Sequence, residues 1–129
     1  MRIFVNRVGE ERRGVAFRCD AGVGMARWMG SELPIQGSTA YVELNVPDPV
    51  VEWQRVAPTV RYDIDVDEDG CLWIRGEVLT VGGPGDPVVT LRVGTDVVMI
   101  EVGTGRETLV VGERIAFTTL ALEVYPYDV

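Results

Sequence analysis

Apolar and polar residues alternate along most of this chain with the period of two that is typical of β-strands. The clearest example is residues 38–46, where Ala40, Val42, Leu44 and Val46 alternate with more polar neighbours. The same pattern, punctuated by Gly, Pro and Asp, recurs from the first residues to the last. It predicts strands over 1–8, 14–19, 38–46, 59–67, 71–81, 88–93 and 96–102, followed by one or two strands between 108 and 129.

The connections between these strands carry their own signals. Two residues beginning with Gly94 separate two strands, which predicts a hairpin with a type II′ turn. Residues 21–37 are rich in Gly and predict an irregular segment. In 47–58, Asp48 followed by Pro49 suits the start of one helical turn, whereas the flanking prolines favour an irregular edge segment. Both interpretations of 47–58 stay open.

Seven to nine short strands and at most one short helical turn make this an all-β chain. Nothing within 1–129 reads as a linker, a repeat or a low-complexity tract, so we expect a single domain. The architecture that fits is a small closed or partly open antiparallel β-barrel, and a β-sandwich is the alternative.

The second half of the chain, residues 71–127, carries a resemblance to a known fold. It has a long strand ("LWIRGEVLTV"), a loop, a hairpin ("VVTLRVGTDVVMIEV") and then "GERIAF", which looks like the entry to a later strand of an OB-fold. The resemblance implies a small OB-like barrel. It also implies binding of a small molecule or a single-stranded nucleic acid, for which basic and aromatic side chains on the sheet face are usual.

The charge of the chain points elsewhere. Its formal net charge is -8 and its pI about 4.5. Such a surface repels phosphate, so nucleic acid and anionic membranes are disfavoured as partners, while a basic protein is favoured. No apolar run approaches the roughly 20 residues that cross a bilayer, and the first residues lack the apolar core of a secretion signal. We therefore expect a cytoplasmic protein.

Every basic residue is Arg, because the chain has no Lys and no His. This excludes Schiff-base lysines, the P-loop lysine, a histidine base and histidine metal ligands. Neither Ser31 nor Ser38 has a histidine to activate it. Cys19 and Cys71 cannot close a zinc site alone, and we expect free, buried thiols. The sequence thus predicts a protein that is not an enzyme and has no cofactor.

The stretch "DVDEDG" in 65–70 matches half of a calcium loop. Counted from Asp65, positions 1, 3, 5 and 6 are Asp, Asp, Asp and Gly, as an EF-hand requires. Position 12 is Gly76, where a Glu is needed, and the flanks read as strands. We therefore reject the metal candidates Asp65, Asp67 and Asp69 and predict an acidic β-hairpin with its turn at Gly70.

The glycine-rich segment offers two further features. "GVG" in 22–24 lacks the spacing and the following helix of a phosphate-binding loop. Met25, Trp28, Met29 and Leu33 lie close together in the same segment. They form either a lid that folds back on the end of the barrel or a contact patch for a partner.

These features predict a non-enzymatic acidic binding protein, of the immunity or inhibitor type, that engages a basic protein partner. A small-molecule or single-strand-binding OB-like module is the alternative, and a structural subunit whose edge strands pair between copies is a third. The oligomeric state stays open. The contact residues predicted for the basic partner are Asp63, Asp65, Asp67, Glu68 and Asp69, with Trp28 and Met29 as apolar anchors.

Overall fold

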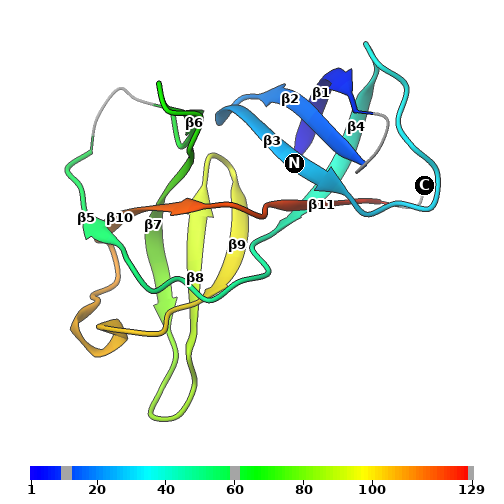
Figure 1. Cartoon of the computed structure of the whole chain (residues 1–129). Coiled ribbons are helices and arrows are strands. Elements are labelled where there is room, and N and C mark those ends of the chain that lie inside the picture. The colour runs from blue at the N-terminus through cyan, green and yellow to red at the C-terminus, as the bar shows by residue number, and fades with distance from the viewer. Residues whose placement is uncertain (10–12, 59–61, 128–129) are drawn as a thin grey trace.

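The computed structural model describes residues 1–9, 13–58 and 62–127, which form an all-β protein (Figure 1). One 3-10 turn, η1 (Arg106–Thr108), is the only helical element in these residues. The strands are β1 (Arg2–Val8), β2 (Gly14–Cys19), β3 (Gly22–Trp28), β4 (Thr39–Asn45), β5 (Gln54–Arg55), β6 (Ile64–Val66), β7 (Leu72–Val81), β8 (Val88–Val93), β9 (Asp96–Glu101), β10 (Arg114–Thr119) and β11 (Glu123–Pro126).

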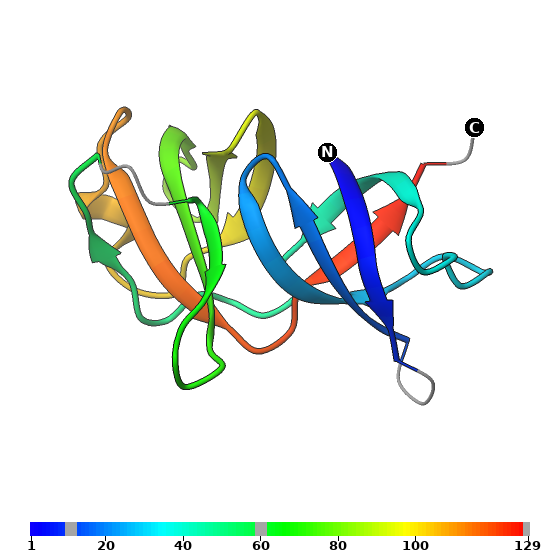
Figure 2. The same ribbon diagram turned by 90° about the horizontal axis from the view of Figure 1, so that it is seen from above.

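Five of the strands close into a barrel. β1, β2 and β3 form an antiparallel meander, β4 pairs with the other edge of β1, and β11 fills the place between β3 and β4. β11 runs parallel to β3 and antiparallel to β4. The last strand of the chain thus lies among the first four (Figures 1 and 2). The ring is filled by apolar side chains that include Ile3, Val5, Phe17, Val42 and Val124.

The remaining strands build a second lobe beside the ring (Figure 2). They pair in the order β9, β8, β7, β10 and β5, and β6 joins β7 to β3 of the ring. A parallel bridge between Val50 and Val102 ties the segment before β5 to the end of β9. The apolar side chains of both lobes belong to one buried cluster, in which Leu91, Ile115 and Phe117 come from the second lobe.

Several sequence predictions are confirmed in detail. β2 spans the predicted residues, and β4 buries Val42 and Leu44 while exposing its polar face. The β8–β9 hairpin turns at Gly94, whose φ of 61° is the left-handed value that the first residue of a type II′ turn needs. The chain after 108 forms two strands, β10 and β11.

The prediction of an irregular segment over 21–37 is wrong for its first part, because Gly22–Trp28 is strand β3. The strand escaped detection because its alternation is inverted. Its buried positions are mostly small, whereas Val23 and Met25 are about half exposed. Glycine is needed at position 24, since a Cβ there would lie 2.9 Å from the Phe17 ring. Small residues on the inner face leave room for that ring.

Other boundaries also differ. The described residues form eleven strands rather than the seven to nine predicted, because β3 and the two-residue β5 were not predicted. The 47–58 segment takes its irregular form, with β5 at Gln54–Arg55. Of the predicted strand 59–67, residues 59–61 lie outside the described residues and only Ile64–Val66 is strand. The closed ring also uses little of 71–127, the region of the OB resemblance, which contributes only β11 to it.

Candidate functional site

The acidic residues that the sequence offered as a partner surface are engaged mainly inside the molecule. Asp63 precedes β6, and its carboxylate accepts a hydrogen bond from the backbone N–H of Gly94 at 2.8 Å. It also forms an ion pair with Arg114 of β10, with 2.5 Å between Nη2 and Oδ1. On β6, Oδ1 of Asp65 lies 3.0 Å from Nη1 of Arg75 on β7. Each of these two carboxylates is thus paired with an arginine.

Asp67 organises the turn between β6 and β7. Its Oδ1 accepts hydrogen bonds from the backbone N–H groups of Asp69 and Cys71, each at 2.9 Å. Its Oδ2 accepts one from the indole N–H of Trp73, also at 2.9 Å. The indole hydrogen bond and then the Cys71 N–H hold the pKa of this carboxyl below its ordinary value. Asp67 is therefore a structural residue of the hairpin.

The tip of the hairpin is the part that stays open. Glu68 and Asp69 are exposed, and neither carboxylate forms a hydrogen bond or an ion pair with another described residue. Gly76, the twelfth position of the rejected calcium loop, lies in β7 opposite Ile115. In the part of the chain that the structure describes, no three His, Cys, Asp or Glu side chains gather as a metal-binding group.

Replacing Asp67 by Asn is expected to lower the melting temperature at pH 7, because Nδ2 would face the indole N–H donor. The folded-state pKa of Asp67 is depressed, so its stabilisation is complete above the unfolded pKa of about 4 and is lost as pH falls through the folded pKa. Circular dichroism melts from pH 7 to pH 3 should show the two proteins converging at low pH. Asp69→Asn is the control and should melt like wild type at pH 7.

Trp28 is not an exposed anchor, which corrects one predicted contact. Its side chain is only 4% exposed, and its indole N–H donates to the carbonyl of Glu32 at 2.7 Å. Its own carbonyl accepts a hydrogen bond from Nε of Arg13. Met29 is half-buried beside it, and its backbone N–H donates to Val124 of β11. Trp28 thus belongs to the buried core, and its indole N–H holds the segment that follows β3.

That segment borders a groove of about 840 Å³ on the outside of the ring. Tyr41 of β4, with Tyr125 and Tyr127 at the end of the chain, line it and are 60%, 40% and 53% exposed. Leu33 and Ile35 line the same groove and are also exposed. We call these five residues the tyrosine groove. Its tyrosines were not among the contact residues predicted from the sequence, although Tyr41 lies on the predicted outer face of 38–46.

The tyrosine groove continues toward the second lobe. Tyr125 also lines a neighbouring hollow of about 510 Å³, together with Val97 and Met99 of β9. The Tyr125 hydroxyl donates to Oε1 of Glu123, which also accepts a hydrogen bond from Asn45. Partial burial, and then the neighbouring Glu123 carboxylate, raise the pKa of Tyr125. This ring is thereby fixed in a neutral, hydrogen-bonded state against its carboxylate neighbour.

Carboxylates lie along the same surface. Glu32 lines the tyrosine groove, Glu43 lines the neighbouring hollow, and Glu123 holds Tyr125. None of these three forms an ion pair with a described residue. The surface therefore combines exposed apolar and aromatic area with carboxylates, of which Glu123 lies opposite Arg27 in the β3–β11 pairing.

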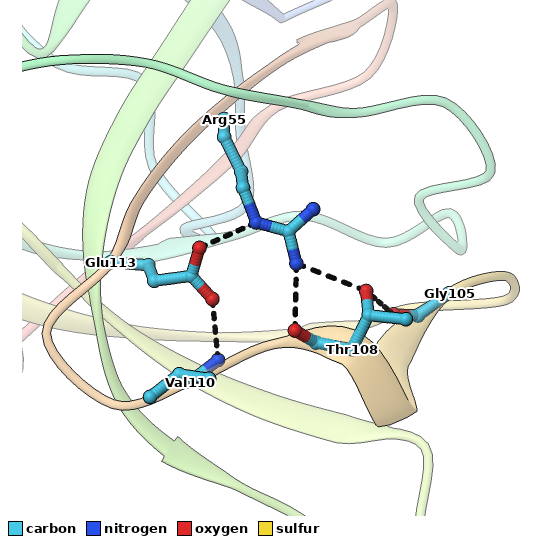
Figure 3. A network of polar contacts seen from close by, with 5 residues as sticks. All are labelled: Arg55, Gly105, Thr108, Val110 and Glu113. Carbon is cyan, nitrogen blue, oxygen red and sulfur yellow. Dashed lines mark hydrogen bonds and ion pairs between the residues drawn. The ribbon is translucent and has the colours of Figure 1, made fainter.

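A second polar cluster serves the fold (Figure 3). Nε of Arg55 donates to Glu113 at 2.5 Å, while Nη2 donates to the carbonyl and hydroxyl of Thr108. The other Glu113 oxygen accepts the backbone N–H of Val110 at 2.7 Å. The Arg55 hydrogen bond and then the Val110 N–H hold the pKa of Glu113 below its ordinary value. These contacts fasten β5 to η1 and to the turn before β10.

The two thiols and the Ser38 hydroxyl form no hydrogen bond with a carboxylate side chain among the described residues. Cys19 and Cys71 are half-buried and free, and burial raises the pKa of the Cys19 thiol, which disfavours the nucleophilic thiolate. Ser38 donates its hydroxyl hydrogen to the carbonyl of Ile35. No helix in the described chain is long and apolar enough to span a membrane. Comparisons with known protein families, with curated proteins and with solved structures found no match.

Proposed function

We propose that this chain is a non-enzymatic binding module that engages a basic segment of a protein partner on the tyrosine groove. The observation that carries the proposal is the exposure of three tyrosines, Tyr41, Tyr125 and Tyr127, side by side on one groove. Tyrosine contributes large contact area at low entropic cost and is enriched among the residues that dominate binding energy. The groove takes the place of the acidic hairpin as the main contact surface.

The charge around the groove selects the class of partner. Glu32, Glu43 and Glu123 would face Arg or Lys side chains of the bound segment, and the net charge of -8 would steer a basic partner toward the protein. The apolar residues of the segment would pack against Leu33 and Ile35. An immunity- or inhibitor-type role, in which an acidic protein neutralises a basic one, fits this combination.

The finer fold assignment accompanies this proposal. We infer that the five-stranded ring is the OB-like part of the chain, and that the second lobe is an insertion between its fourth and fifth strands, β4 and β11. Under this assignment the resemblance belongs to the strands of 1–45 and to β11. Fold alone assigns no ligand, so the proposed function rests on the tyrosine groove.

The test is selection from a random twelve-residue peptide library on the immobilised protein, followed by titration of the selected peptides. We expect sequences that mix Arg or Lys with apolar residues. Tyr127→Ala and Ile35→Ala should each weaken their binding about tenfold or more, as loss of a central contact does. Because both side chains are largely exposed, neither change should alter the melting temperature much.

The matched control is Tyr62→Ala, which removes an equally exposed tyrosine, 65% accessible, from outside the groove. Its affinity for the selected peptides should equal that of wild type. Selection of acidic peptides, or equal loss of binding in Tyr62→Ala and Tyr127→Ala, would reject the proposal.

A further inference from the structure

A second hollow lies on the outer surface of the ring and carries positive charge. It has a volume of about 370 Å³ and opens over β1, the end of β2 and the start of β4. The side chains that give it chemical character are Arg2, Phe4, Arg18, Asp20 and Thr39. Both arginines are exposed, and Phe4 is half-buried.

Strand pairing places these side chains together. Phe4 of β1 lies opposite Arg18 of β2 and opposite Thr39 of β4. The Arg18 guanidinium stacks on the Phe4 ring, with 4.2 Å between Cζ and the ring centroid. Arg2 precedes Phe4 by two residues on the same strand, so it points to the same side and is a diagonal neighbour of Arg18. One guanidinium is thus held flat by an aromatic ring, with a second beside it.

Neither guanidinium is neutralised within the described chain. No ion pair or hydrogen bond joins the side chain of Arg2 or Arg18 to another described residue, and Asp20 is the one carboxylate on the wall of the hollow. The wider charge distribution agrees with this. Residues 1–28 contain six of the twelve arginines but only three of the twenty carboxylates. The negative net charge therefore belongs to the rest of the chain.

We propose that this hollow binds a nucleotide, either free or as part of a single strand. The chemistry follows from the three groups. Phosphate would be held by Arg2, whose planar fork suits its oxygens. The base would stack on the outer face of the Arg18 guanidinium, which Phe4 supports from behind. The Asp20 carboxylate offers an acceptor for an N–H group on the base edge, such as the ring N–H of thymine. This inference does not rest on the proposed protein partner.

The test uses a fluorescein-labelled twelve-residue oligo-dT, with dTMP and inorganic phosphate as competitors, measured by anisotropy at low salt. Wild type should bind the oligonucleotide, and Arg2→Ala combined with Arg18→Ala should weaken binding at least about tenfold. Arg18→Lys keeps the charge but loses the flat stacking surface, so it should weaken binding by several-fold. All these side chains are exposed, and circular dichroism melts check that the variants stay folded.

Arg92→Ala removes an exposed arginine of β8 and should bind the oligonucleotide like wild type. Tyr127→Ala should also bind it like wild type, which would separate this site from the tyrosine groove. If dTMP competes at low concentration, the site binds free nucleotides. If only unlabelled oligo-dT competes, the site binds a single strand. The inference is overturned if nothing binds, if inorganic phosphate competes as well as dTMP, or if Arg92→Ala weakens binding as much as the double variant.

Discussion

Replacing Gly22 by Ala is expected to lower the free energy of unfolding by about 3–5 kcal/mol. Gly22 begins β3 with a φ of 135°, which L-residues rarely adopt. A Cβ at this position would lie 1.9 Å from the carbonyl oxygen of Ile64 and 2.9 Å from Cβ of Tyr62. The backbone of β6 cannot easily move away from β3, because the N–H of Ile64 donates a hydrogen bond to the carbonyl of Ala21 at 2.9 Å.

Two other glycines serve as matched controls for this substitution. Gly37 has a left-handed φ of 85° but open space around its Cα, so Gly37→Ala isolates the cost of conformation, about 1 kcal/mol. Gly14 has neither constraint, and Gly14→Ala should change stability by less than about 0.5 kcal/mol. Urea unfolding of the three variants measures the series. If Gly22→Ala lowered the free energy of unfolding no more than Gly37→Ala does, the close approach of β6 to β3 would be contradicted.

The same contact explains why β3 could not be read from the sequence. Pattern-based prediction assumes that buried positions are apolar and large, whereas β3 buries Gly22 and Gly24 so that a neighbouring strand and the Phe17 ring can approach. β4 and the β8–β9 hairpin were predictable because their alternation and turn residues are local signals. A requirement set by a partner strand leaves no local signal.

The closed ring could not be predicted from the sequence for a related reason. It depends on β11 pairing with both β3 and β4, and these pairings join Glu123 to Arg27 and to Asn45 across most of the chain. The same long connection brings Tyr125 and Tyr127 next to Tyr41. The tyrosine groove is therefore a product of topology, and no local motif could have identified it.

The acidic hairpin shows a different case, in which the local pattern was predicted correctly but the ion pairs of its carboxylates were not. The alternation around Ile64 and the turn at Gly70 were recognised, but the positions of Arg75 and Arg114 opposite the carboxylates depend on strand pairing. For the hollow that contains Arg2 and Arg18, the sequence did carry a signal from which the site could have been predicted. The concentration of arginines in 1–28 is visible in the sequence, and a single net charge for the chain conceals it.

Truncating one phenylalanine in each lobe is expected to destabilise the whole chain in a single transition. Phe17 fills the ring and Phe117 the second lobe, and each is 1% exposed. Phe→Ala at a buried site costs about 3–5 kcal/mol, from lost burial and the cavity left behind. One buried cluster spans the two lobes, β6 pairs with strands of both, and β10 leads directly into β11. Neither lobe should therefore remain folded when the other unfolds.

Urea unfolding followed by both near-UV and far-UV circular dichroism distinguishes one folding unit from two. For each of Phe17→Ala and Phe117→Ala, we expect the near-UV and far-UV curves to coincide. Both curves should shift to lower urea concentration and keep the wild-type slope. Phe17→Leu keeps most of the buried volume and should cost less than about 1.5 kcal/mol. Separate transitions, with only one of them moved by each substitution, would mean that the ring and the second lobe fold independently. In that case the Gly22–Ile64 contact would join two domains rather than two parts of one.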